Sequence, residues 1–307
     1  MSSPIEPPAR RFLHLCWCTD DGDEIVDFLA ENLALRKTME TPLEPSSGDI
    51  FNMEETLLSA AAFVYDERGP RRAPAIEVQT WKEPKMVGEP PTDPARAGMQ
   101  ALGYAMVDLD NTVVALLGAG CSVVGRGTGP AGDETVVMRE PGGVTIDLIR
   151  DREIDESSHL RHLRISVTDL DTSVEWYERM GWQMVDQVPL LDARPYGFDG
   201  AVDADVARLR LPDEATETIL IQWNDPTTHG RHPERAYHAG LYRAALGVDD
   251  TRATYEALVA EGVEFDHVPM LVELHDTPVP DMWICFLRDP DGVSYEFVQR
   301  PRDAFRT

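Results

Sequence analysis

Hydrophobic and polar positions follow one order at the start of the chain: a strand, an amphipathic helix and then further strands. Residues 12–18 form a strand-like, mostly apolar run, and a helical period follows at residues 22–34. Two more strand-like runs occupy residues 60–65 and 75–81, and a polar, proline-rich segment, residues 82–97, ends the unit. These patterns predict a first module that reads strand, helix, strands.

The same order returns three times further along the chain. A second unit begins with a strand at residues 101–107 and ends with one at residues 143–149. A third begins at residues 163–167, and a fourth runs from a strand at residues 242–248 to a last strand at residues 293–299. We therefore expect four βαβββ modules, which together form an α+β fold.

The first and third modules also resemble each other residue by residue. Residues 14–29 align without a gap with residues 162–177, so that Asp21 falls on Asp169. Internal self-similarity of this length indicates the architecture before any single residue is interpreted. Both segments open on a histidine, and such a histidine is a candidate metal ligand.

Length and charge pattern place a boundary near the middle of the chain. The 307 residues are enough for two domains, each with its own core. The charged stretch at about residues 150–158 is typical of a linker. We therefore expect an N-terminal domain at residues 1–150 and a C-terminal domain at residues 159–307.

Composition excludes several classes of protein. Hydrophobic residues make up 42% of the chain, yet no run approaches the roughly 18 apolar residues of a membrane span. The N-terminus has no apolar signal segment, and the four cysteines lie in strand-like runs, which suits buried thiols in a reducing compartment. We expect a cytoplasmic protein.

The net charge of −27 narrows the choice of partner. A field of this sign repels nucleic acid and anionic membranes. The acidic residues are dispersed along the chain and form no single tail. We expect a small-molecule ligand and no nucleic-acid or membrane partner, in a protein that is either a monomer or a homodimer.

Several segments carry a resemblance to a known family. In the C-terminal half they are HLRISVTDLDTSVEWYERMGW, LGVDDTRATYEALVAEGVEF and FLRDPDGVSYEFVQ, with looser counterparts such as LHLCWCTDDGDEIVDFLAENL and PGGVTIDLI in the N-terminal half. The chain resembles the vicinal oxygen chelate (VOC) superfamily, which includes glyoxalases, bleomycin-resistance proteins and extradiol dioxygenases. The resemblance implies two tandem glyoxalase-like domains, each with two modules whose curved mixed sheet surrounds a cleft.

The resemblance also implies where a metal would bind, because the family's ligands usually come from the first and last strands of each module. In the C-terminal half these positions hold His162, Ile219, Arg243 and Glu296. A guanidinium has no lone pair to give, so this set is incomplete. We expect metal-independent chemistry with His162 as acid or base, Arg243 as an anion clamp, and Glu296 as a base or as the partner of Arg243. The alternative is an Arg243–Glu296 ion pair that only organises the cleft.

The N-terminal half offers a different set at the same positions. His14, Glu77 and Asp147 are joined there by Ala101. One imidazole and two carboxylates suit Mg²⁺, Mn²⁺ or Zn²⁺ better than a redox iron site, so iron is not expected. The alternative is a divergent scaffold cleft that holds no metal, in which case the protein requires no cofactor.

Four further residues are candidates for substrate contacts. Tyr242, Trp223 and Trp283 could line a cleft as aromatic walls, and His275 lies in a long connection that could reach over the cleft mouth. Core packing is the alternative for each aromatic residue.

Three functions fit these features. The first is a proton-transfer enzyme of the isomerase, cyclase or lyase type that acts on a small oxygenated metabolite, for instance in specialised metabolism. The second is a protein of the bleomycin-resistance kind that sequesters a small molecule. The third is a metal-dependent enzyme like a glyoxalase or dioxygenase. A buried His/Arg/Glu trio is costly unless it is paired or used, which favours the first.

Overall fold

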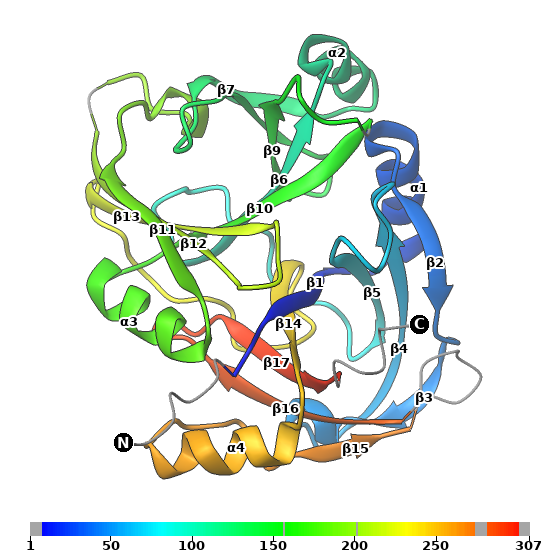
Figure 1. Ribbon diagram of the computed structural model, residues 1–307. Helices are drawn as coiled ribbons and strands as arrows, with labels where there is room; N and C mark the ends of the chain where they lie inside the picture. Colours follow the sequence, from blue (N-terminus) through cyan, green and yellow to red (C-terminus); the bar gives the residue numbers. More distant parts are fainter. Residues whose placement is uncertain (1–7, 156, 201, 274–280, 301–307) are drawn as a thin grey trace.

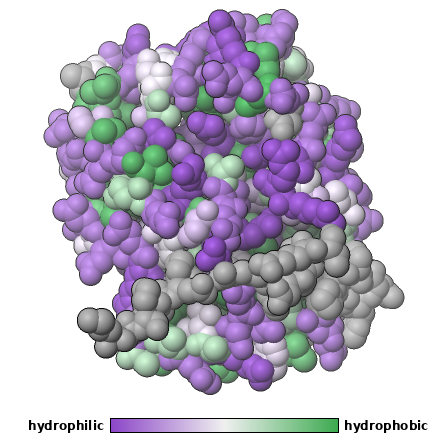
Figure 2. Space-filling view, viewed as in Figure 1, coloured by the Kyte–Doolittle hydropathy of each residue, from purple (hydrophilic) through white to green (hydrophobic). Residues whose placement is uncertain are grey.

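The computed structural model describes residues 8–155, 157–200, 202–273 and 281–300 (Figure 1). Within them the α-helices are α1 (Gly22–Leu33), α2 (Leu109–Gly118), α3 (Leu170–Met180) and α4 (Thr251–Ala260), and the short 3-10 helices are η1 (Asp49–Phe51) and η2 (Arg194–Tyr196). None of these helices is long and apolar enough to cross a membrane. On the face seen in Figure 2, most described side chains are hydrophilic.

Each α-helix begins after an aspartate. The side chain of Asp21 accepts a hydrogen bond from the Glu24 N–H, and that of Asp169 accepts one from the Thr172 N–H. Asp108 and Asp250 cap α2 and α4 in the same way. An aspartate at this position satisfies a backbone donor that the helix itself leaves unpaired. The repeated aspartate therefore sets where all four helices start.

The strands form two sheets. One is nine-stranded and follows the spatial order β15 (Met270–Val272), β16 (Met282–Arg288), β17 (Ser294–Gln299), β14 (Gly240–Val248), β1 (Arg11–Thr19), β5 (Ala75–Glu83), β4 (Thr56–Tyr65) and β2 (Arg36–Glu40), with β3 (Glu44–Ser47) paired to β4. The other is eight-stranded and follows the order β11 (Gln183–Pro189), β12 (Asp203–Arg210), β13 (Glu217–Asp225), β10 (Ser158–Ser166), β6 (Gly98–Met106), β9 (Thr145–Arg150), β8 (Glu134–Arg139) and β7 (Ser122–Thr128).

These two sheets confirm the α+β fold of βαβββ modules, but they pair the modules differently from the expectation. The nine-stranded sheet joins the first module to the fourth, and the eight-stranded sheet joins the second to the third. Each half of the sequence therefore contributes one module to each sheet. The expectation that each half closes a cleft of its own is wrong.

Antiparallel pairing of first strands joins the modules within each sheet. β1 pairs with β14, so that His14 lies opposite Ala245. β10 pairs with β6, so that His162 lies opposite Gly103. In each case the two joined strands open their respective modules. The two sheets are thus built by the same rule from different pairs of modules.

The strands β2 and β3 were not predicted. Their residues are mostly exposed and polar, as in the sequence Glu44–Ser47. Strands that lack a buried face show no alternation of apolar and polar residues, which is the signal that indicates a strand from sequence.

One continuous hydrophobic core joins the helices to both sheets. It contains Leu15 of β1, Leu163 of β10 and Phe297 of β17, together with Leu29 of α1. Between the sheets, the Tyr177 ring of α3 lies edge-on to the Tyr295 ring of β17 at a centroid distance of 5.8 Å. Because this core includes both sheets, we expect the described chain to unfold as one unit.

Replacing Leu163 with alanine tests this expectation. Leu163 is fully buried in the shared core, so the Leu163→Ala variant should lose about 2–5 kcal/mol of unfolding free energy. Far-UV circular dichroism and tryptophan fluorescence should report one transition, shifted together to lower denaturant. Val114→Ala, at an exposed position of α2, is the control and should change the stability by less than about 0.5 kcal/mol. Two transitions, of which only one moves, would contradict a shared core.

Candidate functional site

The face of the nine-stranded sheet opposite the helices carries a cluster of charged side chains, which we call the first cup. It consists of His14 on β1, Glu77 on β5, Arg243 on β14 and Glu296 on β17. Side chains alternate between the two faces of a strand, so one residue from each of four neighbouring strands meets here. All except His14 are buried, and His14 is nearly so.

Arg243 is bound at the centre of the first cup. Its NH2 group lies 2.7 Å from both carboxylate oxygens of Glu77, and its Nε lies 3.4 Å from Oε2 of Glu296. The Nε2 atom of His14 lies 3.4 Å from Oε2 of Glu77 and 3.4 Å from Oε2 of Glu296. The four side chains therefore form one network, in which the guanidinium and the imidazole share two carboxylates.

Electrostatics keep this network ionised. Burial by itself disfavours the charge of Arg243, but the Cys16 sulfur and the carboxylates of Glu77 and Glu296 outweigh it and raise the pKa of Arg243 above its ordinary value. Burial also opposes the charge of Glu296, but His14 and Arg243 lower the pKa of this carboxyl. The first cup therefore brings one guanidinium together with two carboxylates.

Some buried polar atoms of the first cup have no hydrogen-bond partner among the described residues. Within the described residues, Nε2 of His14 and both Nε and NH1 of Arg243 are buried and make no hydrogen bond. A buried donor without a partner costs roughly 1–3 kcal/mol, so such atoms point to an acceptor that comes from elsewhere.

An aromatic side chain covers the first cup. Phe51 of η1 lies with its ring centroid 5.2 Å from the Arg243 guanidinium carbon, and it packs against Trp81 and Phe286 at 5.5 and 5.7 Å. The ring Nε2–H of His267 donates a hydrogen bond to the Ile50 carbonyl at 3.0 Å, which holds η1 in place.

The eight-stranded sheet carries a second cluster, which we call the second cup. Asp147 on β9 accepts hydrogen bonds from Nε and NH2 of Arg164 at 2.7 and 3.0 Å. It also lies 3.0 Å from Nε2 of His162, and the Arg164 guanidinium stacks on the Tyr196 ring at 4.6 Å. Burial opposes ionisation of Asp147, but Arg164 and His162 lower the pKa of Asp147. The second cup is therefore an ion-pair network around Asp147, in which NH1 of Arg164 is buried and makes no hydrogen bond within the described residues.

The structure regroups the residues that the sequence placed together. His162 lies in the second cup, so it is not beside Arg243 and Glu296 as expected. Asp147 also lies in the second cup, so it does not join His14 and Glu77. The reason is strand pairing: β17 neighbours β14 and β1, whereas β9 neighbours β6 and β10. The two expected sets of four positions therefore exchange two members each, Ala101 and Asp147 for Arg243 and Glu296.

Sequence reasoning missed Arg164. It lies two residues after His162 on β10, where Cys16 stands after His14 on β1. Alternation along a strand places residues two apart on the same face, so this position could have been recognised as pointing into a cup. A charged residue at that position was the available signal.

The four residues expected to contact a substrate lie in different places in the structure. Tyr242 packs with Cys16, Cys18 and Trp81 in the first cup, and its hydroxyl donates to the Glu234 carbonyl at 3.0 Å. Trp223 is buried in the second cup against Tyr196 and Phe198.

The other two of these residues lie elsewhere. Trp283 of β16 lies under the Arg252 guanidinium at 4.7 Å, on the side of α4, so it does not face the first cup. The expectation that Trp283 lines the cleft is therefore wrong. His275 lies outside the described residues.

Comparisons with known proteins agree with the fold. Residues 159–297 match the family model described as "Glyoxalase/Bleomycin resistance protein/Dioxygenase superfamily". The structure is similar to that of glyoxalase I from Zea mays, with a TM-score of 0.69, 18% identity, and coverage of 94% of this chain and 92% of that chain. It is also similar to a putative dioxygenase from Bacillus subtilis subsp. subtilis str. 168, with a TM-score of 0.62, 13% identity, and coverage of 95% and 86%. A search of curated proteins by sequence gave no match.

Residues 159–297 therefore match the model of this superfamily, and the glyoxalase-like fold extends over both sheets of the structure. At such low identity the structural likeness describes the fold, and the residues of the cups have to decide the chemistry.

Proteins of this superfamily typically use a divalent metal, so the first cup can be tested for its fit to one. His14, Glu77 and Glu296 are suitable ligand types, but the fourth corner is Arg243, whose NH2 lies 2.7 Å from both oxygens of Glu77. Within the described part of the chain, no three His, Cys, Asp or Glu side chains are arranged to hold a metal ion. A guanidinium cannot be a ligand and repels a cation, so these residues do not fit a four-ligand metal centre.

Replacing Arg243 with histidine should turn the first cup into a metal-binding site. The Arg243→His variant removes the positive charge beside His14, Glu77 and Glu296 and supplies an imidazole as a fourth ligand. Imidazole and carboxylate groups are ligands that Co²⁺ and Zn²⁺ prefer, so this variant should bind one of these ions. Co²⁺ absorption and calorimetric titration would measure this binding. Arg243→Met is the matched control and supplies no ligand. Equal metal binding by the wild type and both variants would contradict the role given to Arg243.

The lowered pKa values of Asp147 and Glu296 predict a sensitivity to acid. A carboxyl whose pKa is lower in the folded state stabilises the fold above its unfolded pKa of about 4, and this contribution disappears as the pH falls below that value. The unfolding free energy, measured by urea titration, should therefore decrease as the pH falls below about 4. The Glu296→Gln variant should show a smaller decrease over the same range. An equal decrease in both proteins would contradict this assignment.

Proposed function

We propose that the first cup catalyses proton transfer at a carbon next to a carbonyl group of a small oxygenated molecule. The observation that carries this proposal is the pair of buried, unbonded groups in the cup: the Nε and NH1 atoms of Arg243 and the Nε2 atom of His14. One side offers the hydrogen-bond donors of a guanidinium, and the other offers an imidazole nitrogen, the group that most often serves as a general base.

Each residue then has a defined part. The substrate carbonyl accepts a hydrogen bond from Arg243, and the proton on the neighbouring carbon passes to Nε2 of His14. The electrons of the C–H bond form the enolate, whose oxygen the guanidinium stabilises. Return of the proton from His14 to another position or face gives the isomerised product.

The two glutamates support these groups. Glu77 holds Arg243 through both of its oxygens, and Glu296 lies 3.4 Å from both Nε2 of His14 and Nε of Arg243. When His14 accepts a proton, the imidazolium lies between the two carboxylates, which stabilise its charge. Because the cup has an excess of negative charge before the reaction, a neutral carbonyl compound suits it better than an anion.

Access to the first cup requires η1 to move. Phe51 lies over the Arg243 guanidinium and contacts Trp81 and Phe286, in the space that a substrate would need. A substrate with an apolar or ring-bearing part could replace the Phe51 ring on the same aromatic surfaces.

This aromatic lining also favours a second function, the sequestration of a small molecule. In that case the ligand would replace Phe51 without any bond being changed. Binding with no chemical turnover is the outcome that separates the two functions.

Hydrogen exchange into carbonyl compounds tests the proposal. The protein is incubated in D₂O with a panel of small hydroxyketones and diketones, and loss of the α-proton signal is followed by proton NMR. We expect catalysed exchange of at least one compound. His14→Gln should lower its rate by about 10²–10⁴-fold, because general base catalysis contributes that much. Arg243→Met should also lower the rate strongly.

A variant of the second cup tests whether the exchange takes place in the first cup or in the second. His162→Gln should leave exchange largely in place, since His162 lies in the other sheet. Loss of exchange in His162→Gln and its retention in His14→Gln would move the proposed activity to the second cup. Binding of a compound without exchange in the wild type would support sequestration instead.

A further inference from the structure

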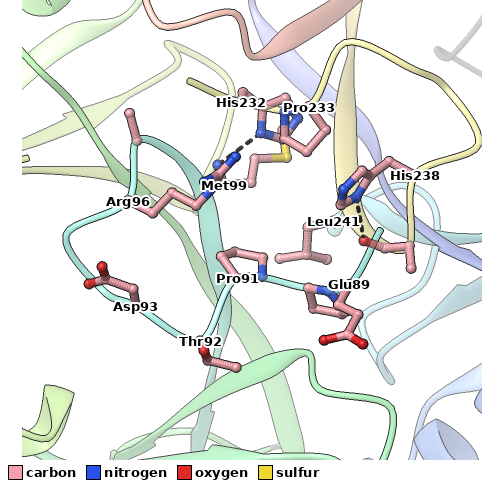
Figure 3. A pocket seen from close by; sticks show the side chains of 13 residues that line it. Glu89, Pro91, Thr92, Asp93, Arg96, Met99, His232, Pro233, His238 and Leu241 are labelled. Atoms are coloured by element: carbon pink, nitrogen blue, oxygen red, sulfur yellow. Dashed lines mark hydrogen bonds between the residues drawn. The ribbon is translucent and has the colours of Figure 1, made fainter. Parts of the chain in front are cut away.

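A cavity of about 250 Å³ lies outside both cups, between two connections that join modules (Figure 3). The first connection, residues 84–97, leads from β5 to β6, and the second, residues 226–239, leads from β13 to β14. We call this space the linker cavity. It plays no part in the function proposed above.

The two connections hold each other in a fixed arrangement. Val87 pairs with His238, and Arg96 pairs with His229, each in a parallel bridge. The Val87 N–H donates to the Tyr237 carbonyl at 3.1 Å, and the Ala97 N–H donates to the His229 carbonyl at 2.8 Å. The cavity is therefore bounded by backbone that is already paired, so a ligand would find it formed in advance.

Glycine allows the connections to approach this closely. A side chain on Gly88 would place its Cβ 2.0 Å from Nε2 of His238, and one on Gly240 would place its Cβ 3.1 Å from Pro90. Both residues also have positive φ angles, which glycine adopts without strain. The packing of His238 against Gly88 leaves this imidazole as a wall of the cavity.

The floor of the cavity is apolar or uncharged. Met99 and Leu241 contribute apolar surface, and the buried His232 also lines the cavity. Nδ1 of His232 accepts a hydrogen bond from the Met99 N–H, and its Nε2–H donates to the Tyr242 carbonyl at 2.7 Å. Burial, followed by the positive charges of Arg288 and Arg96, lowers the pKa of His232 to about 3, so this ring is neutral.

Two opposite charges at the rim are available to a ligand. Within the part of the chain that the structure describes, Arg96 and Glu89 line the cavity, and neither side chain has an ion-pair or hydrogen-bond partner. Figure 3 shows them on opposite sides of Pro91. The other acid at the rim, Asp93, is already engaged, because it accepts the Ala95 N–H at 2.9 Å and lies 3.4 Å from His229.

We infer that the linker cavity binds a small zwitterionic metabolite of the amino acid class. The ligand's carboxylate would pair with the Arg96 guanidinium, and its ammonium group would pair with Glu89. An apolar side chain would lie over Met99, Leu241 and the neighbouring prolines. The volume lies just below the usual range for ligand pockets of about 300–1,000 Å³, which restricts the ligand to metabolite size.

A titration with leucine and two derivatives tests this inference. Leucine amide lacks the carboxylate, and N-acetyl-leucine lacks the ammonium group, so each should bind at least about tenfold more weakly than leucine. Calorimetry or saturation-transfer NMR on the full-length protein measures the affinities. A panel of the other common amino acids, run in the same way, defines which side chain the floor prefers.

Variants that each remove one charge test whether leucine binds in the linker cavity. Arg96→Gln and Glu89→Gln should each weaken leucine binding about tenfold or more and leave the thermal unfolding curve unchanged, since both side chains are exposed. Lys85→Gln and Glu234→Gln remove the same charges at exposed positions of the two connections that do not line the cavity, and both should bind leucine normally.

Three results would overturn the inference. They are the absence of binding by any amino acid of the panel, equal binding of leucine and its two derivatives, and normal binding by both Arg96→Gln and Glu89→Gln. All are independent of exchange in the first cup, because Arg96 and Glu89 take no part in that network.

Discussion

The antiparallel pairing of module-opening strands is the constraint on which the rest of this structure depends. β1 pairs with β14 and β10 pairs with β6, so each sheet is completed by a module from the other half of the sequence. The same pairing decides which residues meet, because a cup collects side chains from four neighbouring strands. It also brings the two connections between modules against each other, which creates the linker cavity. Fold, cups and cavity therefore share one physical origin.

Both cups have a histidine on the strand that opens one module and a carboxylate on a strand that closes another. Each adds an arginine from a different place: Arg243 from β14 in the first cup, and Arg164 from β10 in the second. A buried guanidinium needs a carboxylate to offset its desolvation, which Glu77 and Asp147 provide. The networks differ in what they leave unbonded. Both cups leave a guanidinium NH1 without a hydrogen bond within the described residues, but only the first also leaves an imidazole nitrogen, Nε2 of His14, in that state, which is why the proposed chemistry lies there.

Local features were readable from the sequence because they rest on short-range physics. The aspartates that begin the four helices satisfy nearby backbone donors, and the period of apolar residues reflects which face of a helix or strand is buried. The resemblance to the family implied that His14, Glu77, Arg243 and Glu296 point into clefts, and these four side chains do so, although the resemblance divided them between two clefts. Arg164 could have been added by the same alternation. The exposed strands β2 and β3 gave no such signal.

The sequence by itself determined the modules, their α+β fold and the inward-facing positions on each strand. The tertiary structure alone decided that the first module joins the fourth, so that His14 rather than His162 lies beside Arg243 and Glu296. Four similar modules can pair in more than one way, and alternation within a strand is identical in each arrangement. The partner of a module-opening strand is selected by contacts between residues far apart in the chain, and no local pattern records them.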